Sequence, residues 1–266
     1  MKKSSQKQAN FPKISVVTPS YNQAKYIKAT IDSVLSQNYP NLEYWVIDGG
    51  STDDTVKILK SYGKKINWIS EKDKGQTDAI NKGLRKCDGD IMAYLNSDDI
   101  YFPGALMAVG EYYSKTHADW ITGDCIVIDE KGKPSRGGWI VRAYKRLLML
   151  LYSRTTLMIA DSMLPQPSTF WSRRAWERVG EFNDRYHYVM DYDYWLRMSK
   201  YYRPHDLKVV LSGFRAQPES KSETSRQKLM DEGDISLRHN EANCLHLFFH
   251  RVHSAFVRFV YNLLKK

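Results

Sequence analysis

The segment DIMAYLNSDD, residues 90–99, passes from a short apolar stretch directly into four polar residues. Its first part has the length and composition of a buried β-strand. The residues that follow, Asn96, Ser97, Asp98 and Asp99, are typical of turns, and the carboxylates among them also suit a divalent cation. The segment therefore indicates both a strand and a candidate site at the end of that strand.

Upstream of this segment the chain shows the same order, a β-rich run followed by a helical stretch, three more times. The expected strands are 14–18, 42–47, 66–70 and 90–95, and the helices that follow them are 24–37, 53–62, 76–86 and 103–115. Four β-then-α units predict an α/β fold with a mostly parallel sheet flanked by helices. Ligands of such sheets bind beyond the carboxyl ends of the strands.

All four expected strands end in polar loops: PSYNQ at 19–23, DGGSTDD at 48–54, EKDKGQTD at 71–78 and NSDD at 96–99. Each loop alone is typical of a turn or a helix N-cap. Four such loops at one sheet edge favour a binding site. The glycine-rich patterns that cradle phosphates with backbone amides do not occur, so phosphate must be bound in another way.

After residue 119 the alternation becomes irregular. We expect a pair of β segments at 120–129 and 138–141, and a short apolar helix at 144–152. Further on we expect a strand and a helix within 165–182, a helix at 190–202 and a strand at 209–217.

Composition limits the class of protein. The 266 residues, 42% hydrophobic and 26% charged, are typical of a folded globular chain. Cys87, Cys125 and Cys244 are widely spaced and form no CxxC pair, which favours a reducing, cytoplasmic setting. The basic start lacks the apolar stretch of a signal peptide, and no apolar run reaches the length that crosses a bilayer, so we expect neither export nor a membrane span.

The net charge is +10, with lysines clustered near the start and basic residues near the end of the chain. This excess is consistent with an anionic partner or with an ordinary solvated surface. Nucleic acid is the weakest of these partners, because no nucleic-acid recognition motif accompanies the charge.

The stretch 241–264 has an apolar stripe at helical spacing, flanked by Arg251 and Arg258. It predicts an amphipathic helix that lies on an acidic membrane, or that packs on its own body or on a second subunit. Three histidines in this stretch, together with His239 before it, could suggest a metal site, but no carboxylate accompanies them. The stripe consists of Leu245, Phe248, Val252, Phe256, Phe259 and Leu263.

Five strings carry a resemblance to a known family. The chain resembles the family 2 glycosyltransferases, with their GT-A (Rossmann-like) nucleotide-sugar-binding fold, over about residues 14–215. The strings are TPSYN at 18–22, IDGGSTDDT at 47–55, DKGQTDAINKGL at 73–84, LNSDD at 95–99 and MDYDYWLR at 190–197.

The resemblance implies a nucleotide-sugar donor, typically a UDP-sugar, and a Mn²⁺ or Mg²⁺ ion. The family's Asp-x-Asp metal motif is here Asn96-Ser97-Asp98, which leaves Asp98 as the metal ligand and gives Asn96 a role towards the sugar or a coordinated water. Residues implied to bind the nucleotide sugar are Thr18, Pro19, Tyr21, Asp48, Asp78, Lys82, Asn96 and Ser97.

The resemblance also implies the catalytic base. The family's acidic pair at the start of a helix reads Met190-Asp191 here, so Asp191 takes the role of general base in an inverting displacement, and Asp193 is the alternative. Without the resemblance, an acidic first turn would be explained by the helix dipole. Aromatic candidates for acceptor binding are Trp139, Trp171, Tyr188, Tyr192 and Trp195, of which at most two are expected to serve, with Trp171, Tyr192 and Trp195 preferred.

The expected organisation is a basic arm at 1–13, a catalytic domain at 14–217 and a helical tail at 218–266. The catalytic domain divides into a nucleotide-binding half, 14–118, and an acceptor half, 119–217. The expected function is transfer of a sugar to a glycan or lipid-linked acceptor in bacterial polysaccharide synthesis. A nucleotidyltransferase and a catalytically weak nucleotide-sugar-binding protein are the alternatives, and a homodimer remains open.

Overall fold

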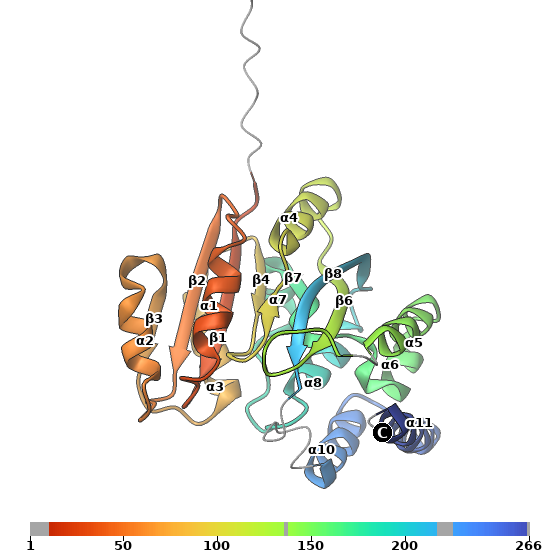
Figure 1. Ribbon diagram of the computed structural model, residues 1–266. Coiled ribbons are helices and arrows are strands. Elements are labelled where there is room, and N and C mark those ends of the chain that lie inside the picture. The colour runs from red at the N-terminus through yellow and green to blue at the C-terminus, as the bar shows by residue number, and fades with distance from the viewer. Residues whose placement is uncertain (1–10, 136–137, 217–225, 265–266) are drawn as a thin grey trace, which may run out of the picture.

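A computed structural model describes residues 11–135, 138–216 and 226–264. It has an eight-stranded sheet in the order β3-β2-β1-β4-β7-β6-β8-β5, with helices on both faces (Figure 1). The strands are β1 Ile14–Ser20, β2 Leu42–Asp48, β3 Asn67–Ser70, β4 Ile91–Tyr94, β5 Ile100–Tyr101, β6 Trp120–Ile128, β7 Thr169–Ser172 and β8 His205–Arg215. The helices are α1 Ile27–Leu35, α2 Thr55–Ser61, α3 Gln76–Lys86, α4 Ala105–Thr116, α5 Gly138–Leu150, α6 Arg154–Ile159, α7 Arg173–Val179, α8 Met190–Met198, α10 Arg226–His239 and α11 Cys244–Leu264.

The first four expected strands form the parallel part of the sheet. β1 pairs in parallel with β2 and β4, and β2 pairs in parallel with β3. Each of the four is followed by a helix, α1 to α4, that covers the sheet. The α/β prediction is therefore confirmed, and so is the helical extension at the C-terminal end.

The second part of the sheet is mixed. β7 is antiparallel to both β4 and β6, while β8 is parallel to β6. The prediction of a strand at 138–141 was wrong, since this segment lies in helix α5. Arg142 and Arg146, one helical turn apart, both bind Asp124 on β6, an arrangement that a helix allows. The end of β6 pairs with β8, and Ile128 also forms an isolated antiparallel bridge with Pro134.

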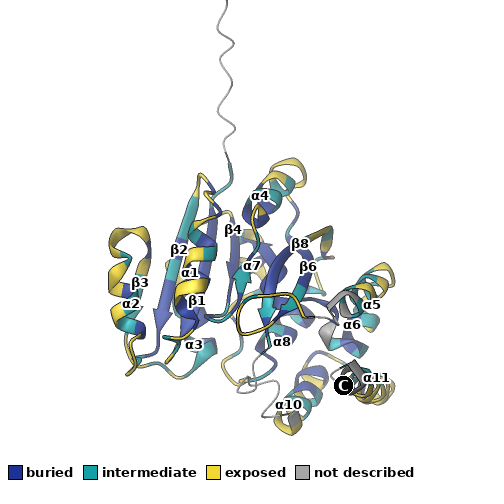
Figure 2. Ribbon diagram, in the orientation of Figure 1, coloured by how far each residue is buried: buried dark blue, intermediate teal, exposed yellow. Residues whose placement is uncertain are grey.

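Two hydrophobic clusters fill the space between sheet and helices (Figure 2). Side chains alternate along β1, so that Val16 belongs to the cluster under α1 and α4, whereas Val17 belongs to the cluster under α3 and α8. Strands buried on both faces explain the nearly continuous apolar runs in the sequence. Both clusters include residues from before and after residue 119, so the two expected halves share one core.

The C-terminal helices α10 and α11 pack on the body. Leu237 of α10 and Leu247 of α11 are buried in the same cluster as Trp195. His250 is also buried, and its ring nitrogen lies 3.3 Å from the carbonyl of Ile159. In the part of the chain that the structure describes, no helix is long and apolar enough to cross a membrane. The expected catalytic domain begins at Ile14, where β1 begins, and its expected end at 217 lies in residues that the structure does not describe.

Candidate functional site

The carboxyl ends of β1, β2, β3 and β4 lie at one edge of the sheet because these strands are parallel. β1 lies between β2 and β4, so the chain leaves β1 on one side for β2 and returns on the other side for β4. Such a reversal of strand order opens a crevice at the ends of the two central strands. The loops that begin at Tyr21, Gly49 and Asn96 therefore meet at this edge.

The loops after β1 and β2 brace each other. Asn22 has a left-handed backbone with φ of 50°, and its N–H donates to Ser51 Oγ at 2.8 Å. Its side-chain oxygen accepts from the Thr52 N–H at 2.9 Å. Asp53 accepts from the Ala24 N–H at 3.0 Å. These polar residues fix the shape of the edge, which explains why the two loops are rich in Asn, Ser and Asp.

Asp48 is fully buried at the end of β2. Its carboxylate accepts hydrogen bonds from the N–H and hydroxyl of Ser51 and, at 2.7 Å, from the hydroxyl of Ser70 at the end of β3. The carboxylate thus ties two loops together. Its contact with a nucleotide base stays a prediction and would require this loop to move.

The residues predicted at the end of β1 differ in exposure. Thr18 is fully buried, and its hydroxyl lies 3.0 Å from the hydroxyl of Tyr44. Pro19 is buried as well, and the prediction that these two residues line a nucleotide pocket stays a prediction. Tyr21 is 58% exposed and is the aromatic ring of this loop that a nucleotide base can reach.

Asp73, at the start of the loop after β3, approaches the loop after β2 closely. A Cβ atom on Gly49 would lie 2.6 Å from Asp73 Oδ2, so any larger residue there would displace this carboxylate. Asp73 also accepts from the Gly75 N–H at 2.8 Å. Burial raises the pKa of Asp73.

Asp78 and Lys82 lie one turn apart on α3. Lys82 Nζ is 3.3 Å from Asp78 Oδ2 and 3.1 Å from Glu71 Oε1. Burial alone would raise the pKa of Asp78, but the hydrogen bonds from the Lys74 N–H and from Lys82 outweigh it, and the pKa is lowered. Asp78 is therefore an anion whose charge is balanced by Lys82.

The side chain of Asn96 forms the centre of an amide network. Its Oδ1 accepts from Gln76 Nε2 at 2.8 Å, and its Nδ2 donates to Gln166 Oε1 at 3.1 Å and to Asp99 Oδ2 at 3.3 Å. Gln166 in turn donates to the carbonyl of Tyr94 at 2.8 Å. Both ends of the Asn96 amide are thus engaged within the protein, and its role towards a sugar or a coordinated water stays a prediction.

The two aspartates of the same loop have different surroundings. Asp99 is fully buried, accepts from the Arg215 N–H at 2.9 Å, and has a pKa raised well above its usual range by burial and by the charge of Asp98. Asp98 is partly exposed, and its carbonyl accepts from Arg215 Nε at 2.7 Å. Ser97 is buried, and its carbonyl accepts from Thr30 Oγ1. Asp98 is therefore the more accessible carboxylate of this loop.

A metal site built wholly from protein side chains is not found. Within residues 11–135, 138–216 and 226–264, no group of three or more His, Cys, Asp or Glu side chains could hold a metal ion. One accessible carboxylate, that of Asp98, still fits an ion such as Mg²⁺ or Mn²⁺ that takes most of its ligands from substrate phosphates and water.

Asp191 lies in the first turn of α8, where the helix dipole favours a negative charge. Its Oδ1 accepts from the Tyr192 N–H at 2.8 Å. Burial raises the pKa of Asp191 to about 6, the charge of Asp161 adds to this rise, and Lys145 opposes it. A carboxyl with this pKa is ionised at neutral pH and is still basic enough to accept a proton.

Asp191 and the loop after β4 lie near the same strand end. Burial raises the pKa of Tyr94 well above its usual range, and the charges of Asp191 and Asp99 raise it further. Charge effects on a pKa weaken with distance, so both carboxylates lie near this last residue of β4.

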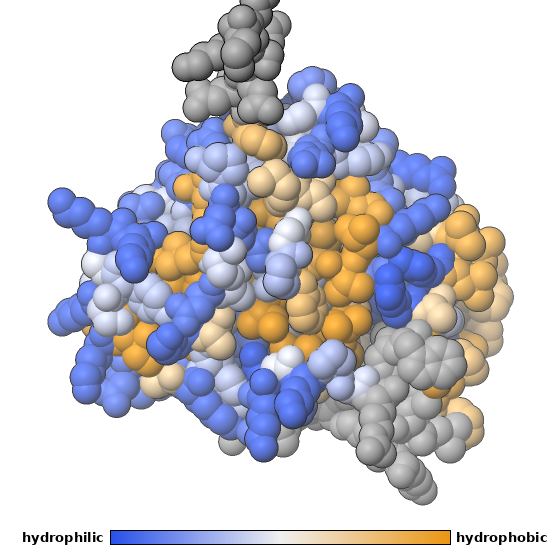
Figure 3. All heavy atoms as spheres, turned by 45° about the horizontal axis from the view of Figure 1, so that its top comes forward, coloured by the Kyte–Doolittle hydropathy of each residue, from blue (hydrophilic) through white to orange (hydrophobic). Residues whose placement is uncertain are grey.

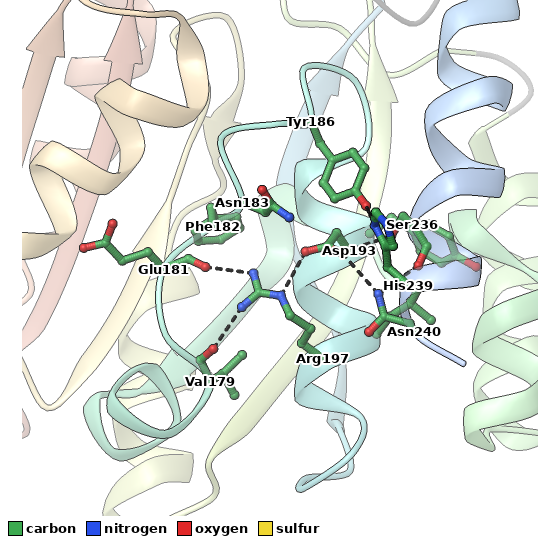
Figure 4. Close-up of polar contacts among 12 residues, drawn as sticks. Val179, Glu181, Phe182, Asn183, Tyr186, Asp193, Arg197, Ser236, His239 and Asn240 are labelled. Atoms are coloured by element: carbon green, nitrogen blue, oxygen red, sulfur yellow. Dashed lines mark hydrogen bonds and ion pairs between the residues drawn. The ribbon is translucent and has the colours of Figure 1, made fainter. Parts of the chain in front are cut away.

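Asp193, two residues further on, has a structural role (Figure 4). It is buried, and its carboxylate accepts from Arg197 Nε at 2.9 Å and from Ser236 Oγ and Asn240 Nδ2 at 3.1 Å each. Arg197 also donates to two backbone carbonyls of the segment before α8. Asp193 therefore joins α8 to α10, and these contacts favour Asp191 over Asp193 as the base, which stays a prediction.

The loop before α8 is also held by α10. Glu232 accepts from the backbone N–H groups of His187 and Tyr188, with the shortest distance 2.8 Å. The Tyr186 hydroxyl lies 2.8 Å from His239 Nδ1 (Figure 4). Helix α10 consequently fixes the approach to Asp191, which the sequence did not indicate.

The aromatic residues predicted for acceptor binding lie mostly inside the core. Trp171 and Trp195 are each 1% exposed and pack against each other, with ring centroids 5.7 Å apart. Tyr192 is buried, and its hydroxyl donates to the carbonyl of Met158 at 2.8 Å. All three are packed inside the protein in this conformation, and an acceptor role for them stays a prediction. Tyr188 is half-buried, and the side chain of Trp139 lies outside the described residues.

Several polar residues of the site were missed from the sequence. Asp73 lies in the string DKGQTDAINKGL, but no role was predicted for it. Asp99 lies next to Asp98, and the metal was assigned to Asp98 alone. Gln166 and Lys145 had no sequence signal, because each reaches the site from a distant segment. The link from Gln166 to Asn96 spans 70 residues of sequence, so only the tertiary structure reveals it.

Comparison with known proteins gives a consistent result. The family model described as "Glycosyl transferase family 2" matches residues 15–177. A chondroitin synthase of Escherichia coli is 31% identical over 71% of this chain and 27% of its own length. An uncharacterized glycosyltransferase of Rickettsia typhi is 28% identical over 74% of this chain and 63% of its own length. The chain thus spans less than two thirds of these relatives.

Solved structures share the fold at low sequence identity. TarS of S. aureus, residues 1–349 in complex with UDP-GlcNAc, has a TM-score of 0.64 at 18% identity, covering 88% of this chain and 69% of that one. The mannosyltransferase PcManGT of Pyrobaculum calidifontis, in complex with GDP-Man and Mn²⁺, has a TM-score of 0.65 at 18% identity, covering 94% and 76%.

Proposed function

Because the chain belongs to glycosyl transferase family 2 and has the GT-A fold, we propose that it is an inverting glycosyltransferase that moves a sugar from a UDP-sugar to a hydroxyl acceptor. The observation that carries this proposal is the carboxyl of Asp191, with a pKa of about 6, near the strand end that is followed by the Asn96–Asp99 loop. A displacement at a sugar carbon needs a base on the side of the attacking hydroxyl. On the opposite side it needs a group that stabilises the departing diphosphate.

Donor binding is proposed at the loops after β1 and β4. Tyr21 would stack on the base, since it is exposed beside a loop whose shape is fixed by Asn22 and Ser51. Lys82, with Asp78, would lie near the diphosphate or the sugar. The TarS and PcManGT complexes show a UDP-sugar and a GDP-sugar on this fold, which supports a nucleotide sugar as the donor class.

A divalent cation is proposed at Asp98. One carboxylate is a weak site for Mg²⁺ or Mn²⁺, so the ion would be held only when the nucleotide diphosphate supplies further oxygen ligands. When bound, the ion would neutralise negative charge on the diphosphate. Asn96, whose amide is engaged by Gln76 and Gln166, would support the loop without touching the ion.

In the proposed reaction, Asp191 removes the proton from the acceptor hydroxyl while that oxygen forms a bond to the anomeric carbon. The bond from this carbon to the diphosphate oxygen breaks at the same time, and the electron pair leaves with the diphosphate. A single displacement inverts the configuration at the anomeric carbon. Burial of Asp191 excludes part of the water that would compete for the base.

The pH dependence follows from the raised pKa of Asp191. The base acts only when ionised, so kcat/KM should rise with pH through about 6 and reach a plateau above it. Initial rates measured from acidic to neutral pH at low substrate would check this. An ordinary aspartate would give a limb near its usual value of 3.8, and a limb at that pH would contradict the role of Asp191.

Coupled binding of metal and nucleotide can be tested by thermal unfolding. UDP with Mn²⁺ should raise the melting temperature, whereas Mn²⁺ alone should not. A ligand at one hundred times its Kd stabilises the native state by about 2.7 kcal/mol. Asp98→Asn should abolish the dependence on Mn²⁺, and Asp54→Asn, at an exposed position after β2, is the control. Stabilisation by GDP-mannose but by no UDP-sugar would refute the proposal that the donor carries uracil as its nucleobase.

A catalytically weak binding protein is the second candidate, because the first carboxylate of the metal motif is absent and Asn96 is engaged within the protein. Such a protein would bind UDP with Mn²⁺ yet show no release of UDP from any UDP-sugar.

Sugar transfer to a glycan or lipid-linked acceptor, in polysaccharide synthesis, is proposed from the likeness to chondroitin synthase. The catalytic unit is proposed to span 14–217.

A further inference from the structure

Helix α11 exposes a row of large apolar side chains. Leu245, Phe248, Val252, Phe256 and Phe259 follow one another at intervals of three or four residues, so they lie on one side of the helix. All five are exposed. A surface helix of a globular protein normally turns its apolar side towards the core.

The opposite side of α11 makes the contacts with the body. Leu247 and His250 are buried there, and the His253 ring stacks on Tyr144 with its Nε2 2.6 Å from the tyrosine hydroxyl. The helix therefore packs on the body, as one of the three predicted alternatives has it, but it does so with the side opposite the predicted stripe, whose described residues are exposed.

Helix α5 also exposes apolar residues, although its Leu148 and Met149 pack against the core. Arg142 and Arg146 point inward to Asp124, while Leu147 of α5 and Leu150 and Leu151 at its end are exposed. The contact between Tyr144 and His253 places α5 beside α11. The exposed apolar residues of the two helices consequently belong to one end of the molecule.

We name this surface the apolar face: Leu245, Phe248, Val252, Phe256 and Phe259 of α11, with Leu147, Leu150 and Leu151 of the α5 segment. These residues are between 50% and 74% exposed. Figure 2 shows exposed residues on α5 and α11, and Figure 3 shows hydrophobic surface at the same side of the molecule. Contiguous apolar surface of this kind marks a site that binds a partner or a membrane.

The positive charge of the chain favours one kind of partner for the apolar face. Arg251 and Arg258 flank the apolar row on α11, and Arg251 also pairs with Asp234. The chain carries a net charge of +10, so a second copy would be repelled and an acidic surface attracted. No helix in the described ranges can cross a bilayer, which leaves a helix lying in the interface. We propose that the apolar face docks on an anionic lipid bilayer, with its phenylalanines and leucines inserted among the lipids.

Vesicle co-sedimentation tests this proposal with the full chain. The protein should bind vesicles of equal parts phosphatidylcholine and phosphatidylglycerol, and binding should weaken in high salt and with phosphatidylcholine alone. Phe248→Ser/Phe256→Ser should reduce the partition coefficient by at least about tenfold, since each inserted aromatic ring contributes strongly. Tyr201→Ser/Ile235→Ser changes two exposed apolar residues elsewhere and should bind like wild type.

Three results would overturn the proposal. The first is absence of binding to the anionic vesicles, and the second is equal loss in the two double variants. The third is equal binding to both vesicle types, which would remove the role of charge. Sedimentation velocity without lipid tests the other occupant, a second copy of the chain. If wild type is a dimer, Phe248→Ser/Phe256→Ser is a monomer and neither binds vesicles, the apolar face would be assigned to a second copy.

Discussion

Asp191→Asn is expected to lower kcat by about 10²–10⁴-fold, the range that a general base contributes. The variant keeps the size of the side chain and its place in the first turn of α8, but it cannot accept a proton from the acceptor. Binding of UDP should be unchanged, because Asp191 would act on the acceptor side of the sugar. Rates of UDP release with the best UDP-sugar, and melting temperatures with UDP, measure these two effects.

The same variant should be more stable than wild type at neutral pH. The folded chain raises the pKa of Asp191 from 3.8 to about 6, so its contribution to stability is fully present below about pH 4 and is lost as the pH rises through 6. Asparagine carries no charge that burial opposes. Because Asp191 is partly exposed, we expect a gain of about 1–3 kcal/mol in unfolding free energy at pH 7.5 and none at pH 4.

Asp184→Asn, at an exposed position shortly before α8, is the matched control and should change neither rate nor stability. A kcat within threefold of wild type, roughly 0.7 kcal/mol in barrier height, would exclude Asp191 as the base. Loss of activity with loss of stability would indicate a structural role instead.

Asp193→Asn should give the opposite result on stability. We expect the unfolding free energy to fall by about 2–4 kcal/mol, because the variant removes a buried charge pair and leaves Arg197 without its carboxylate. An asparagine side chain has only one acceptor oxygen in place of two. In one orientation of its amide, its NH₂ group would face the donors Ser236 and Asn240. Urea unfolding of Asp193→Asn beside wild type and Asp184→Asn measures this loss.

Loss of the Asp193 contacts should also loosen α10. Hydrogen exchange across Arg226–His239 should become faster in Asp193→Asn, and the loop that Glu232 holds before α8 should exchange faster with it. Unchanged exchange in both segments would refute the role of Asp193 in joining α8 to α10. The paired substitutions thus separate two aspartates that stand two residues apart.

The parallel part of the fold was accessible from the sequence because its signals are local. Apolar runs of strand length, each followed by a helical stretch, predicted β1 to β4 and their helices, and α3 lies at the predicted residues. The segment 138–141 was assigned wrongly because Trp, Ile and Val favour strands as an isolated string. Its helix is stabilised by Arg142 and Arg146 binding to Asp124, a contact with a different strand that no local pattern contains.

The candidate site was accessible in part. Acidic and amide residues at strand ends indicated where to look, and the family strings indicated Asp191 and Asp98. The engagement of Asn96 by Gln76 and Gln166 and the burial of Thr18 and Asp48 were not accessible, since they depend on loops that meet only in the folded chain. The burial of Trp171 and Trp195 likewise follows from packing between distant segments.

The sequence by itself determined which residues share a strand or a helix face, since periods of two and 3.6 residues follow from backbone geometry. Only the tertiary structure decided which way each face points. Asp191 and Asp193 have the same helix-dipole environment in sequence, yet α10 covers one of them. The apolar stripe of α11 and Leu147 and Leu150 of α5 face outward, while Asp124 binds the arginines of α5 and His253 contacts Tyr144. Hydrophobic burial is not directional, so contacts between distant residues set the orientation.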